Sequence, residues 1–269
     1  MENKTETPTE KSKNRWTLAR TFHENSKYFS SLIFQQTKSI RDFSRNIDKV
    51  YESSQAFQSY PNVEKISLSK IRFSFWPGSF WSLLSRRRSH RVTKGHEIEF
   101  TKIAKIMKAS AGITVSVAVP DSNNLRQFFR SYPSAGAQYP LELYALRFEQ
   151  NIGTVFHFEP KIDCVSVIAR NISREGLTAH SGFQDDVIAA PAYFVIAARM
   201  ERTLKKYDER GYRFVLLEAG HLAQNILLSA ENLGLGACPL GRFLDDELKN
   251  FLQINTLEEI LYVVALGKK

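Results

Sequence analysis

Residues 212–233 constrain the fold more than any other segment, because they predict one long helix that has to be buried. The segment contains no proline and few charged residues, and Gly234 stands where a C-cap belongs. Since the helix is apolar around most of its circumference, we expect it in the core or at a subunit interface. Three small residues would let another helix approach it closely, namely Ala219, Gly220 and Ala223.

The other regular elements are predicted from hydrophobic periodicity. Apolar side chains recur at helical spacing within residues 97–110 and predict an amphipathic helix that Gly112 ends. The tripeptide Asn151-Ile152-Gly153 reads as a hairpin connection between two strands. Strands are expected over four stretches, 142–148, 154–159, 191–199 and 260–266. The order helix, hairpin, strand, long helix, strand, helix, strand indicates an α+β protein.

The chain divides into three stretches of different composition. Residues 1–15 are polar with almost nothing to bury, which predicts a disordered tail. Residues 16–80 predict an N-terminal extension of short helical pieces that packs on the main body. Residues 81–269 are long enough to bury a large core in one main domain. Five aromatic residues near this boundary read as a packing anchor, or alternatively as a peptide-binding surface: Phe73, Phe75, Trp76, Phe80 and Trp81.

The net charge of +9 suits an anionic partner, such as a phosphate cofactor, an acidic peptide, nucleic acid or a membrane surface. Nucleic acid is the weaker reading, because no zinc-finger, helix–turn–helix or RNA-binding aromatic signature occurs. No stretch is apolar for long enough to span a bilayer, so no membrane association is expected. Cys164 and Cys238 lack a paired spacing, and the first residues form neither a secretory signal nor a transit peptide. We therefore expect a cytoplasmic protein.

Residues 131–144 combine a loop of small residues with a strand. Ser134-Ala135-Gly136-Ala137 carries almost no side-chain bulk, so its backbone can come close to a flat or anionic group. Pro133 and Pro140 stiffen the two ends of the loop. Taken alone, the segment is equally consistent with an ordinary tight turn.

Two further motifs accompany this loop. The run Arg86-Arg87-Arg88-Ser89-His90-Arg91 is dense enough in guanidinium groups to surround a phosphate, and the serine hydroxyl adds one more hydrogen bond. A solvated basic patch is the alternative for such a run. Residues 234–243 form a second glycine-rich segment directly after the long helix. Its alternative reading is a helix C-cap followed by a turn.

In this order, the motifs resemble the flavin-dependent nitroreductase family, and within it the SagB-type branch of azoline dehydrogenases, which form thiazoles and oxazoles in ribosomal peptides. The match to the branch covers roughly residue 20 to the end of the chain. Ala137 departs from it, because many relatives carry a second glycine there. The matching segments are Phe22-His23-Glu24-Asn25-Ser26-Lys27, Tyr60-Pro61, Arg87-Arg88-Ser89-His90-Arg91, Pro133-Ser134-Ala135-Gly136, Tyr139-Pro140-Leu141-Glu142-Leu143-Tyr144, Lys206-Tyr207-Asp208-Glu209-Arg210-Gly211-Tyr212-Arg213 and the run 218–241.

The resemblance implies an FMN-binding fold with a central, mostly antiparallel sheet flanked by helices, and a homodimer with the flavin at its interface. It implies three groups of cofactor-binding residues. The phosphate would be held by Arg87, Ser89 and Arg91, with Arg88 as a further candidate. The ribityl chain and ring edge would lie along Pro133, Ser134, Ala135 and Gly136. The ring near N5 would meet the loop of Leu240, Gly241 and Arg242.

The resemblance also implies a catalytic pair. Lys206 would be the base that takes a proton from the azoline ring, because a lysine becomes a base near neutral pH when burial or neighbouring cations lower its pKa. Tyr207 would orient the lysine or relay the proton. Without the resemblance, this stretch would read as a solvated charged loop. No metal site is expected, because the six histidines show no pair with metal-ligand spacing.

The sequence therefore predicts an FMN-dependent dehydrogenase that oxidises thiazoline or oxazoline rings in a ribosomally made peptide. It would work beside a cyclodehydratase and bind the precursor peptide. One alternative is an FMN-dependent nitroreductase or flavin reductase that acts on small molecules with NAD(P)H. Another is an inactive scaffold of a peptide-modification complex.

Overall fold

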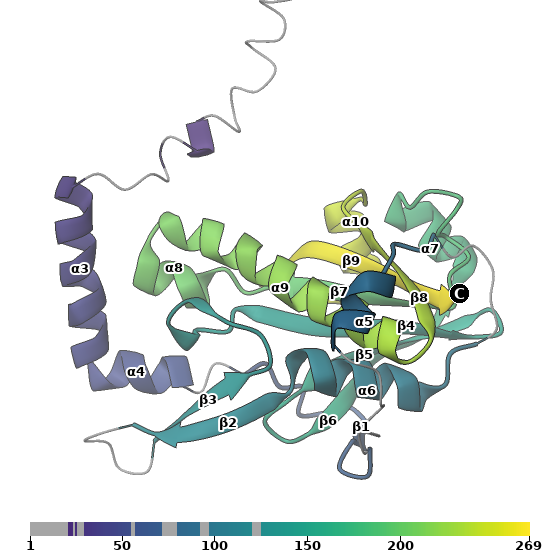
Figure 1. The fold of residues 1–269 in the computed structure, drawn as a ribbon, viewed down its shortest axis with the longest axis horizontal. Coiled ribbons are helices and arrows are strands. Elements are labelled where there is room, and N and C mark those ends of the chain that lie inside the picture. Colours follow the sequence, from purple (N-terminus) through teal and green to yellow (C-terminus); the bar gives the residue numbers. More distant parts are fainter. Residues whose placement is uncertain are drawn as a thin grey trace, which may run out of the picture.

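The computed structural model describes residues 21–23, 25, 30–54, 57–71, 80–91, 97–119 and 125–269. Its centre is a seven-stranded sheet in the order β1-β6-β5-β4-β7-β9-β8, in which every neighbouring pair is antiparallel (Figure 1). The strands are β1 (Lys65–Ser67), β4 (Leu141–Glu149), β5 (Ile152–Glu159), β6 (Cys164–Ser173), β7 (Ala192–Ala198), β8 (Leu235–Leu240) and β9 (Glu259–Lys268). A separate antiparallel hairpin is formed by β2 (Ile113–Ala118) and β3 (Arg126–Arg130).

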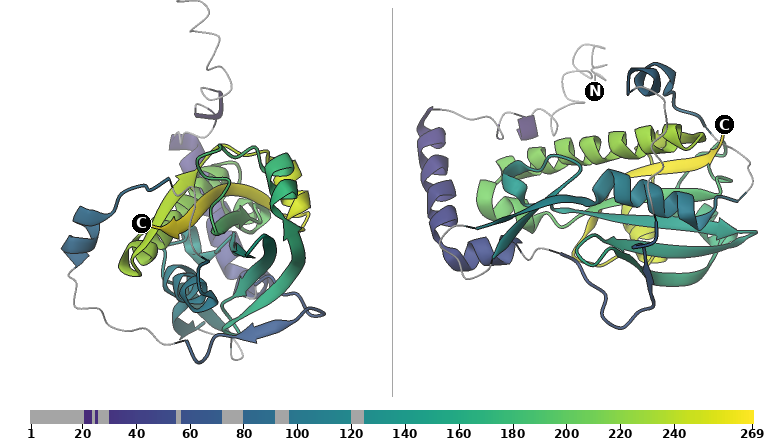
Figure 2. Two further views of the ribbon diagram at one scale, coloured as in Figure 1. Left: turned by 90° about the vertical axis from the view of Figure 1, so that its right-hand side faces the viewer. Right: turned by 60° about the horizontal axis from the view of Figure 1, so that its bottom comes forward.

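Helices lie on both faces of the sheet. The named helices of the structure are α3 (Ser30–Arg45), α4 (Ile47–Ser54), α5 (Phe80–Arg86), α6 (Phe100–Ala111), α7 (Arg174–Ser181), α8 (Glu201–Tyr207), α9 (Arg210–Asn232) and α10 (Asp245–Phe251), with a 3₁₀ turn η1 (Ala135–Ala137). Helices α6 and α9 pack on one face of the sheet, while α7 and α10 cover the other (Figure 2). The predicted α+β architecture, a mostly antiparallel sheet flanked by helices, is confirmed.

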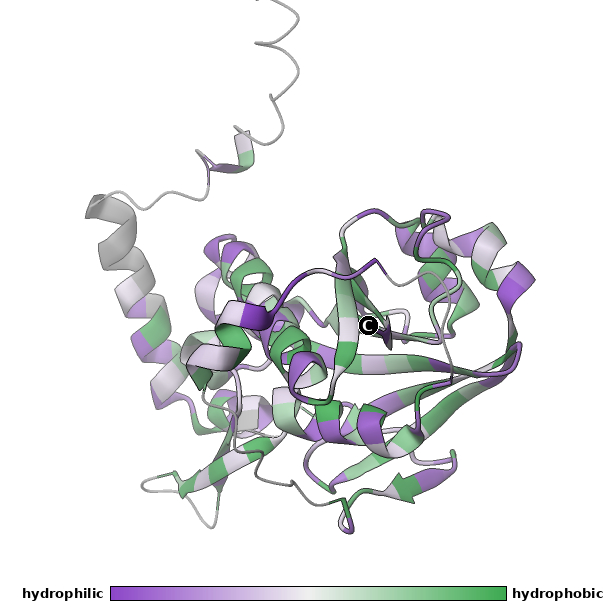
Figure 3. Cartoon of the chain, turned by 45° about the vertical axis from the view of Figure 1, so that its right-hand side comes forward, coloured by the Kyte–Doolittle hydropathy of each residue, from purple (hydrophilic) through white to green (hydrophobic). Residues whose placement is uncertain are grey.

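Strand β7 shows why the core has two layers. All seven of its residues are buried, and its side chains alternate between the two faces, as the pleat requires. Phe194 and Ile196 join the cluster under α6 and α9, whereas Tyr193 and Val195 join the cluster under α7 and α10. A strand with helices on both sides has no polar face, which explains its continuous apolar sequence. Figure 3 draws the strands of the central sheet largely in the hydrophobic colours.

Helix α9 confirms the predicted long helix to within two residues at its start and one at its end. Gly234 follows with a φ of +70°, in the left-handed region that glycine adopts at low cost. One stripe of α9 is fully buried against α6 and the sheet. The opposite face is exposed in the single chain, with side-chain exposures of 39% at Tyr212, 40% at Leu216 and 57% at Leu217. The helix therefore has an apolar face that one chain leaves uncovered.

Several elements differ from the predicted ones. The four predicted strands and the helix ended by Gly112 are present, but the hairpin connection lies one residue earlier than expected. Glu149 pairs with Ile152, so the turn consists of Gln150 and Asn151, and Gln150 adopts a φ of +55°. Strands β1, β2, β3 and β6 were not predicted, and the strand expected after the long helix is β8, in the segment read as a loop.

The N-terminal extension packs on the body of the protein through α3, α4 and the linker after them. Helix α3 contacts α8, and α4 contacts β3. The linker is tied down by a hydrogen bond of 2.7 Å between the Tyr60 and Tyr144 hydroxyls and by a ring contact between Phe57 and Phe128. The position of α4 is therefore fixed on both sides.

Parts of the predicted extension lie outside the described residues, namely the tail at 1–15 and most of the aromatic cluster. Phe80 and Trp81 are described and are 58% and 75% exposed. They contact each other edge to face at 6.0 Å, so the packing-anchor interpretation is wrong for these two within one chain. Among the described helices, none combines the length and the apolar character that a bilayer crossing requires. The domain boundary at residues 80 and 81 stays a prediction.

Candidate active site

The structure brings the predicted catalytic pair against the loop of small residues. Gly136 has a φ of +57°, and a Cβ built on it would lie 2.4 Å from Tyr207 Oη and 2.7 Å from Lys206 Nζ. The absence of a side chain at position 136 therefore gives both groups their place. Three segments that are far apart in the sequence meet here, because Phe43 of α3 lies under the same lysine, with its ring centroid 5.4 Å from Nζ.

The loop is held in a constrained conformation. Ala137 and Tyr139 also have positive φ, at +54° and +44°. The Ser134 hydroxyl accepts a hydrogen bond from the Tyr139 backbone N–H at 2.8 Å, and Gln138 Nε2 donates to the Gly136 carbonyl at 2.8 Å. Left-handed backbone at non-glycine residues is unfavourable and concentrates where the surrounding structure fixes it for function. The loop thus presents one fixed shape to whatever binds it.

Helix α8 is locked to this loop by a buried ion pair. Arg202 donates to the Tyr139 carbonyl at 3.1 Å and pairs with Glu142 at 2.6 Å. Burial opposes ionisation of Glu142, but Arg202 and His157 outweigh it and hold the pKa of this carboxyl at about 2. His157 is fully buried and hydrogen-bonded to Glu142 at 2.9 Å. The anchor keeps Lys206 in register with Gly136.

Lys206 is half-buried, and burial lowers the pKa of its ammonium group. Neighbouring cations are not the cause. Lys205 points to Glu52 of α4 at 3.8 Å, and Arg213 donates to the His23 carbonyl at 3.2 Å. Partial burial of the Lys206 side chain therefore shifts its pKa in the direction that favours the neutral amine.

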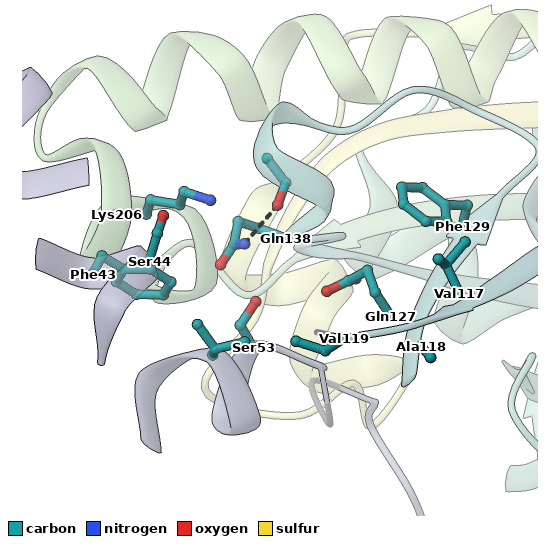
Figure 4. A pocket seen from close by; sticks show the side chains of 12 residues that line it. Phe43, Ser44, Ser53, Val117, Ala118, Val119, Gln127, Phe129, Gln138 and Lys206 are labelled. Carbon is teal, nitrogen blue, oxygen red and sulfur yellow. Dashed lines mark hydrogen bonds between the residues drawn. The ribbon is translucent and has the colours of Figure 1, made fainter. Parts of the chain in front are cut away.

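A cavity of about 290 Å³ opens beside Lys206 (Figure 4). In this view the lysine reaches from α8 towards the loop, and Phe43 lies close to its stem. Apolar side chains form most of the wall, namely Phe43, Val50, Val117, Ala118, Val119 and Phe129. The polar lining is uncharged apart from the lysine and consists of Ser44, Ser53, Gln127 and Gln138. This composition suits a neutral ligand with a few hydrogen-bonding groups.

A second cavity of about 650 Å³ borders the same loop. Its lining includes Tyr132, Pro133, Ser134 and Tyr139, together with Arg130. The Oγ of Ser131 and the Nε of Arg130 are buried and lack a hydrogen-bond partner among the described residues. Unpaired buried donors of this kind are costly, and a polar ligand that accepts hydrogen bonds would satisfy them.

Glu218 is a residue that the sequence analysis missed. It lies on the buried stripe of α9, 2% exposed, facing Ser134 and Ala135. Neither carboxylate oxygen has a hydrogen bond of normal geometry within the described part of the protein, and burial raises its pKa to about 8. The available signal was its position between Val215 and Leu222, which places an acid on the apolar face of a helix. At neutral pH it carries a proton next to the loop.

The arginine motif lies elsewhere, beside β8. Ser89 forms a parallel bridge with Ala237, and the His90 N–H donates to the Ala237 carbonyl at 2.9 Å. Strand β8 ends at Leu240, and the next two residues, Gly241 and Arg242, are exposed. The structure therefore brings the predicted phosphate-binding and N5-contacting residues together.

The four residues of the phosphate motif have different surroundings. Arg88 Nη1 donates to the carbonyls of Ser85 and Arg87, both at 2.9 Å, and thereby caps the end of α5. Arg91 pairs with Asp186 at 3.2 Å. Within the described residues, the Arg87 guanidinium makes no hydrogen bond or ion pair. Arg87 and Ser89 are thus the members most available to an anion.

The predicted site residues form two groups at opposite ends of α9, where Figure 1 shows α8 at one end and α5 with β8 at the other. We call residues 133–136 with 206 and 207 the loop half, and residues 87–91 with 240–242 the arginine half. Glu218 faces the loop half, whereas Glu231 pairs with Arg86 at 3.6 Å beside the arginine half. From Glu218 to Glu231 the helix rises about 20 Å. One chain does not bring the two halves together.

The two halves fit different parts of a flavin mononucleotide. The arginine half offers an available guanidinium and a hydroxyl, which suit a phosphate. The loop half offers a glycine without a side chain, and the neighbouring Arg130 and Ser131 offer buried polar atoms without partners among the described residues. Together they suit a flat polar ring. In the part of the chain that the structure describes, no group of three or more His, Cys, Asp or Glu residues could hold a metal ion.

Comparison with known proteins identifies the family. The model of the nitroreductase family matches residues 84–268. "Putative nitroreductase MJ1384" of Methanocaldococcus jannaschii is 32% identical over 213 residues, which cover 78% of this chain and 94% of that protein. A solved nitroreductase-like structure from Anabaena variabilis superposes with a TM-score of 0.69 at 19% identity, over 92% of this chain and 45% of that one.

The microcin B17 system of Escherichia coli supplies the third similarity. The microcin B17-processing protein McbC is 33% identical over 123 residues, which span 43% of this chain and 44% of McbC. The McbBCD microcin synthetase complex with truncated pro-MccB17 bound contains a chain of the same fold, with a TM-score of 0.53 and 19% identity over 90% of this chain and 98% of that one. With the nitroreductase-like fold, the family match over residues 84–268 and the archaeal relative, this chain belongs to the nitroreductase family.

Proposed function

We propose that this oxidoreductase is an FMN-dependent dehydrogenase that converts thiazoline and oxazoline rings of a ribosomally made peptide into thiazoles and oxazoles. The observation that carries the proposal is the placement of Lys206 and Tyr207 against Gly136, with the lysine half-buried. A base at this position has no role in simple hydride exchange between a nicotinamide and a flavin. It is required when a carbon-bound proton has to leave together with a hydride.

The residues of the chain divide the work as follows. Lys206 in its neutral form takes the proton from one ring carbon, and burial shifts its pKa towards that form. FMN supplies the acceptor for the hydride that leaves the neighbouring carbon. Tyr207, whose ring centroid lies 5.6 Å from Lys206 Nζ, orients the lysine side chain. Loss of one proton and one hydride makes the ring aromatic.

The cofactor is proposed to bind across a homodimer. Arg87, Arg88, Ser89 and Arg91 would hold the phosphate, and Leu240, Gly241 and Arg242 would meet the ring near N5. Pro133, Ser134, Ala135 and Gly136 of the partner subunit would line the ribityl chain and the ring edge. The separation of the two halves along α9 supports this arrangement, and so does the exposed apolar face of the same helix.

The partners are proposed from the microcin similarity. A cyclodehydratase would form the azolines, and the precursor peptide would pass from it to this enzyme in the reducing cytoplasm that the cysteine usage predicts. The similarity to McbC and to a chain of the McbBCD complex supports this assignment. A nitroreductase or flavin reductase that uses NAD(P)H is the second candidate, favoured by the family match and the archaeal relative.

The test compares the wild-type protein with Lys206→Ala and, as a matched control, Lys205→Ala. Lys205 is the neighbouring lysine, 62% exposed and directed to Glu52. All three proteins should bind FMN, seen in the absorbance spectrum and identified by mass after heat release. On a cyclised precursor peptide, Lys206→Ala should lose roughly 10²–10⁴-fold in the rate of the two-dalton mass loss per ring, and Lys205→Ala should resemble wild type.

Three outcomes contradict the proposal at different points. Near wild-type turnover of Lys206→Ala would remove the base assignment. A wild-type protein that reduces nitroaromatics rapidly with NADPH but oxidises no azoline would establish the second candidate. Failure to bind FMN on reconstitution would leave only the scaffold reading.

A further inference from the structure

The described helices of the N-terminal extension do more than cover the body of the protein. Phe43 of α3 is 7% exposed, and its ring lies beside the ammonium group of Lys206. Val50 and Ser53 of α4 line the same cavity as Lys206 and Gly136. The wall facing these helices is the β2–β3 hairpin, which contributes Val117 and Phe129. The cavity is therefore closed on one side by the extension and on the other by the hairpin.

Among the described residues that line this cavity, Lys206 is the only charged one. On α4, Glu52 points to Lys205 of α8 at 3.8 Å, while Asp48 and Lys49 are exposed. Asp42 and Arg45 of α3 are exposed, the hairpin contributes Gln127, and the loop contributes Gln138. Removal of water is the one cause that lowers the pKa of Lys206.

We propose that α3 and α4 form the outer wall of the substrate pocket. Phe43 is the positioning residue that shields Lys206 from water, and the pocket takes an uncharged ring-bearing segment of the peptide. This inference rests on the proposed role of Lys206 as the base. The volume of about 290 Å³ lies at the low end for small-ligand sites and accommodates one five-membered ring with a small neighbouring group. A carboxylate in the pocket would pair with the lysine and hold it in the charged form.

The first test measures the lysine directly and does not depend on turnover. The FMN-loaded protein is treated with a trace of acetic anhydride over a series of pH values, and acetylation at Lys206 and Lys205 is read by fragmentation mass spectrometry. Phe43→Ala should move the midpoint of Lys206 to higher pH by roughly one unit, because water reaches the ammonium group. Phe43→Leu should retain most of the wild-type midpoint. Lys205 serves as the reference amine on the same helix.

A second pair of variants tests the wall by charge. Val50→Glu introduces a carboxylate on the inner face of α4 and should raise the midpoint of Lys206 markedly. Tyr51→Glu places the same group one residue further, at a position that is 54% exposed, and should have a small effect that salt removes. Equal effects of the two variants would show that α4 does not line the pocket.

Kinetics separate this inference from the proposed function. If Lys206 is the base, the alkaline shift in Phe43→Ala also appears in the pH profile of kcat/KM for azoline oxidation, with FMN content unchanged. An unchanged Lys206 midpoint in Phe43→Ala overturns the inference even when the wild type oxidises azolines. A shifted midpoint in a protein that oxidises no azoline overturns the proposed function and leaves the role of Phe43 standing.

Discussion

At position 136 the protein needs a residue without a side chain, for two separate reasons. The backbone is left-handed there, and the space that a Cβ would fill is occupied by the Lys206 amine and the Tyr207 hydroxyl. The next residue, Ala137, is also left-handed at φ +54°, yet it keeps its methyl group. Glycine at 136 is therefore required by the predicted catalytic pair as well as by the turn.

Gly136→Ala should lower azoline oxidation per bound FMN by on the order of 10²-fold. The new methyl group would meet both catalytic groups at less than 3 Å, so both must move, and displacements near 1 Å cost about this much. Ala137→Gly is the matched control, because it lies in the same loop and adds no atoms. Turnover and flavin content measured on both variants check the prediction, and equal turnover of Gly136→Ala and wild type would contradict it.

Glu218→Gln should change how stability depends on pH. Burial raises the pKa of this carboxyl to about 8, while the unfolded chain ionises it near 4.3. Between these values the folded protein retains a proton that the unfolded chain has lost. Wild-type stability therefore falls as pH rises through this range, by at most about 1.4 kcal/mol per pH unit. The glutamine variant lacks this loss.

Denaturant unfolding of the wild type and Glu218→Gln should accordingly agree more closely at about pH 5 than at about pH 8.5, where the variant should be the more stable. Glu258, whose pKa is raised to about 7 by burial, titrates in both proteins and cancels in the difference. Glu247→Gln, which removes an exposed carboxylate, serves as a control. Parallel pH profiles for Glu218→Gln and wild type would show that Glu218 is ionised in the folded state.

At the scale of elements, periodicity predicted those segments in which one face or every face is apolar. This explains the agreement for α6, α9, β4, β5, β7 and β9. Strand β8 was not predicted in this segment because its sequence, Leu-Gly-Ala-Cys-Pro-Leu, is rich in turn residues. Pro239 is tolerated because β8 is an edge strand with one neighbour. Strand β6 has apolar residues at alternate positions, Val165, Val167 and Ala169, which is the pattern of a strand, and it was nevertheless not predicted.

The candidate site was predictable only where a motif is contiguous. The loop at 133–136 and the pair Lys206-Tyr207 each stand in one stretch of sequence, and resemblance assigned them. Phe43 and Glu218 were not identified from the sequence because their roles depend on what tertiary packing places beside them. An acid on a helix or a phenylalanine in an extension has no chemical meaning in the sequence until its neighbours are known.

Leu217→Glu should convert the proposed dimer into a monomer and lower its flavin content. Leu217 is the most exposed of the large apolar residues on α9, and a charge there would lose its hydration in an apolar interface. Light scattering and the ratio of flavin to protein absorbance measure the two effects. Ile162→Glu makes the same change at a residue that is 55% exposed on the β5–β6 connection, and it should affect neither. A Leu217→Glu dimer with full flavin would contradict the prediction.

At the scale of the whole molecule, α9 separates the loop half from the arginine half of the predicted site (Figure 1). A two-fold pairing across its exposed face would bring the arginine half of one chain to the loop half of the other at both ends. Each chain would then contribute to two sites, and neither site would belong to one chain. This arrangement can be tested without a structure of the dimer.

Two inactive variants should restore activity when they are combined in one dimer. The chain with Arg87→Ala and Arg91→Ala retains its loop half, and the Lys206→Ala chain retains its arginine half. A mixed dimer has one site with both halves intact, so random co-assembly should return about one quarter of wild-type azoline oxidation. The variants mixed without subunit exchange are the control. Absence of any recovery in verified mixed dimers would place the whole site within a single chain.

The part of the pocket wall that the extension supplies is separate in sequence from the proposed cofactor-binding residues, which has a consequence for how such a protein can diversify. The described part of the wall on the side of the extension comes from residues 43–53, whereas the residues that would hold the flavin begin at Arg87. The tie through Tyr60 anchors the wall to the sheet without passing through the flavin-binding loops. Under the proposed function, grafting residues 30–62 of one homologue onto the body of another should transfer the choice of peptide, while the redox potential of the recipient stays the same.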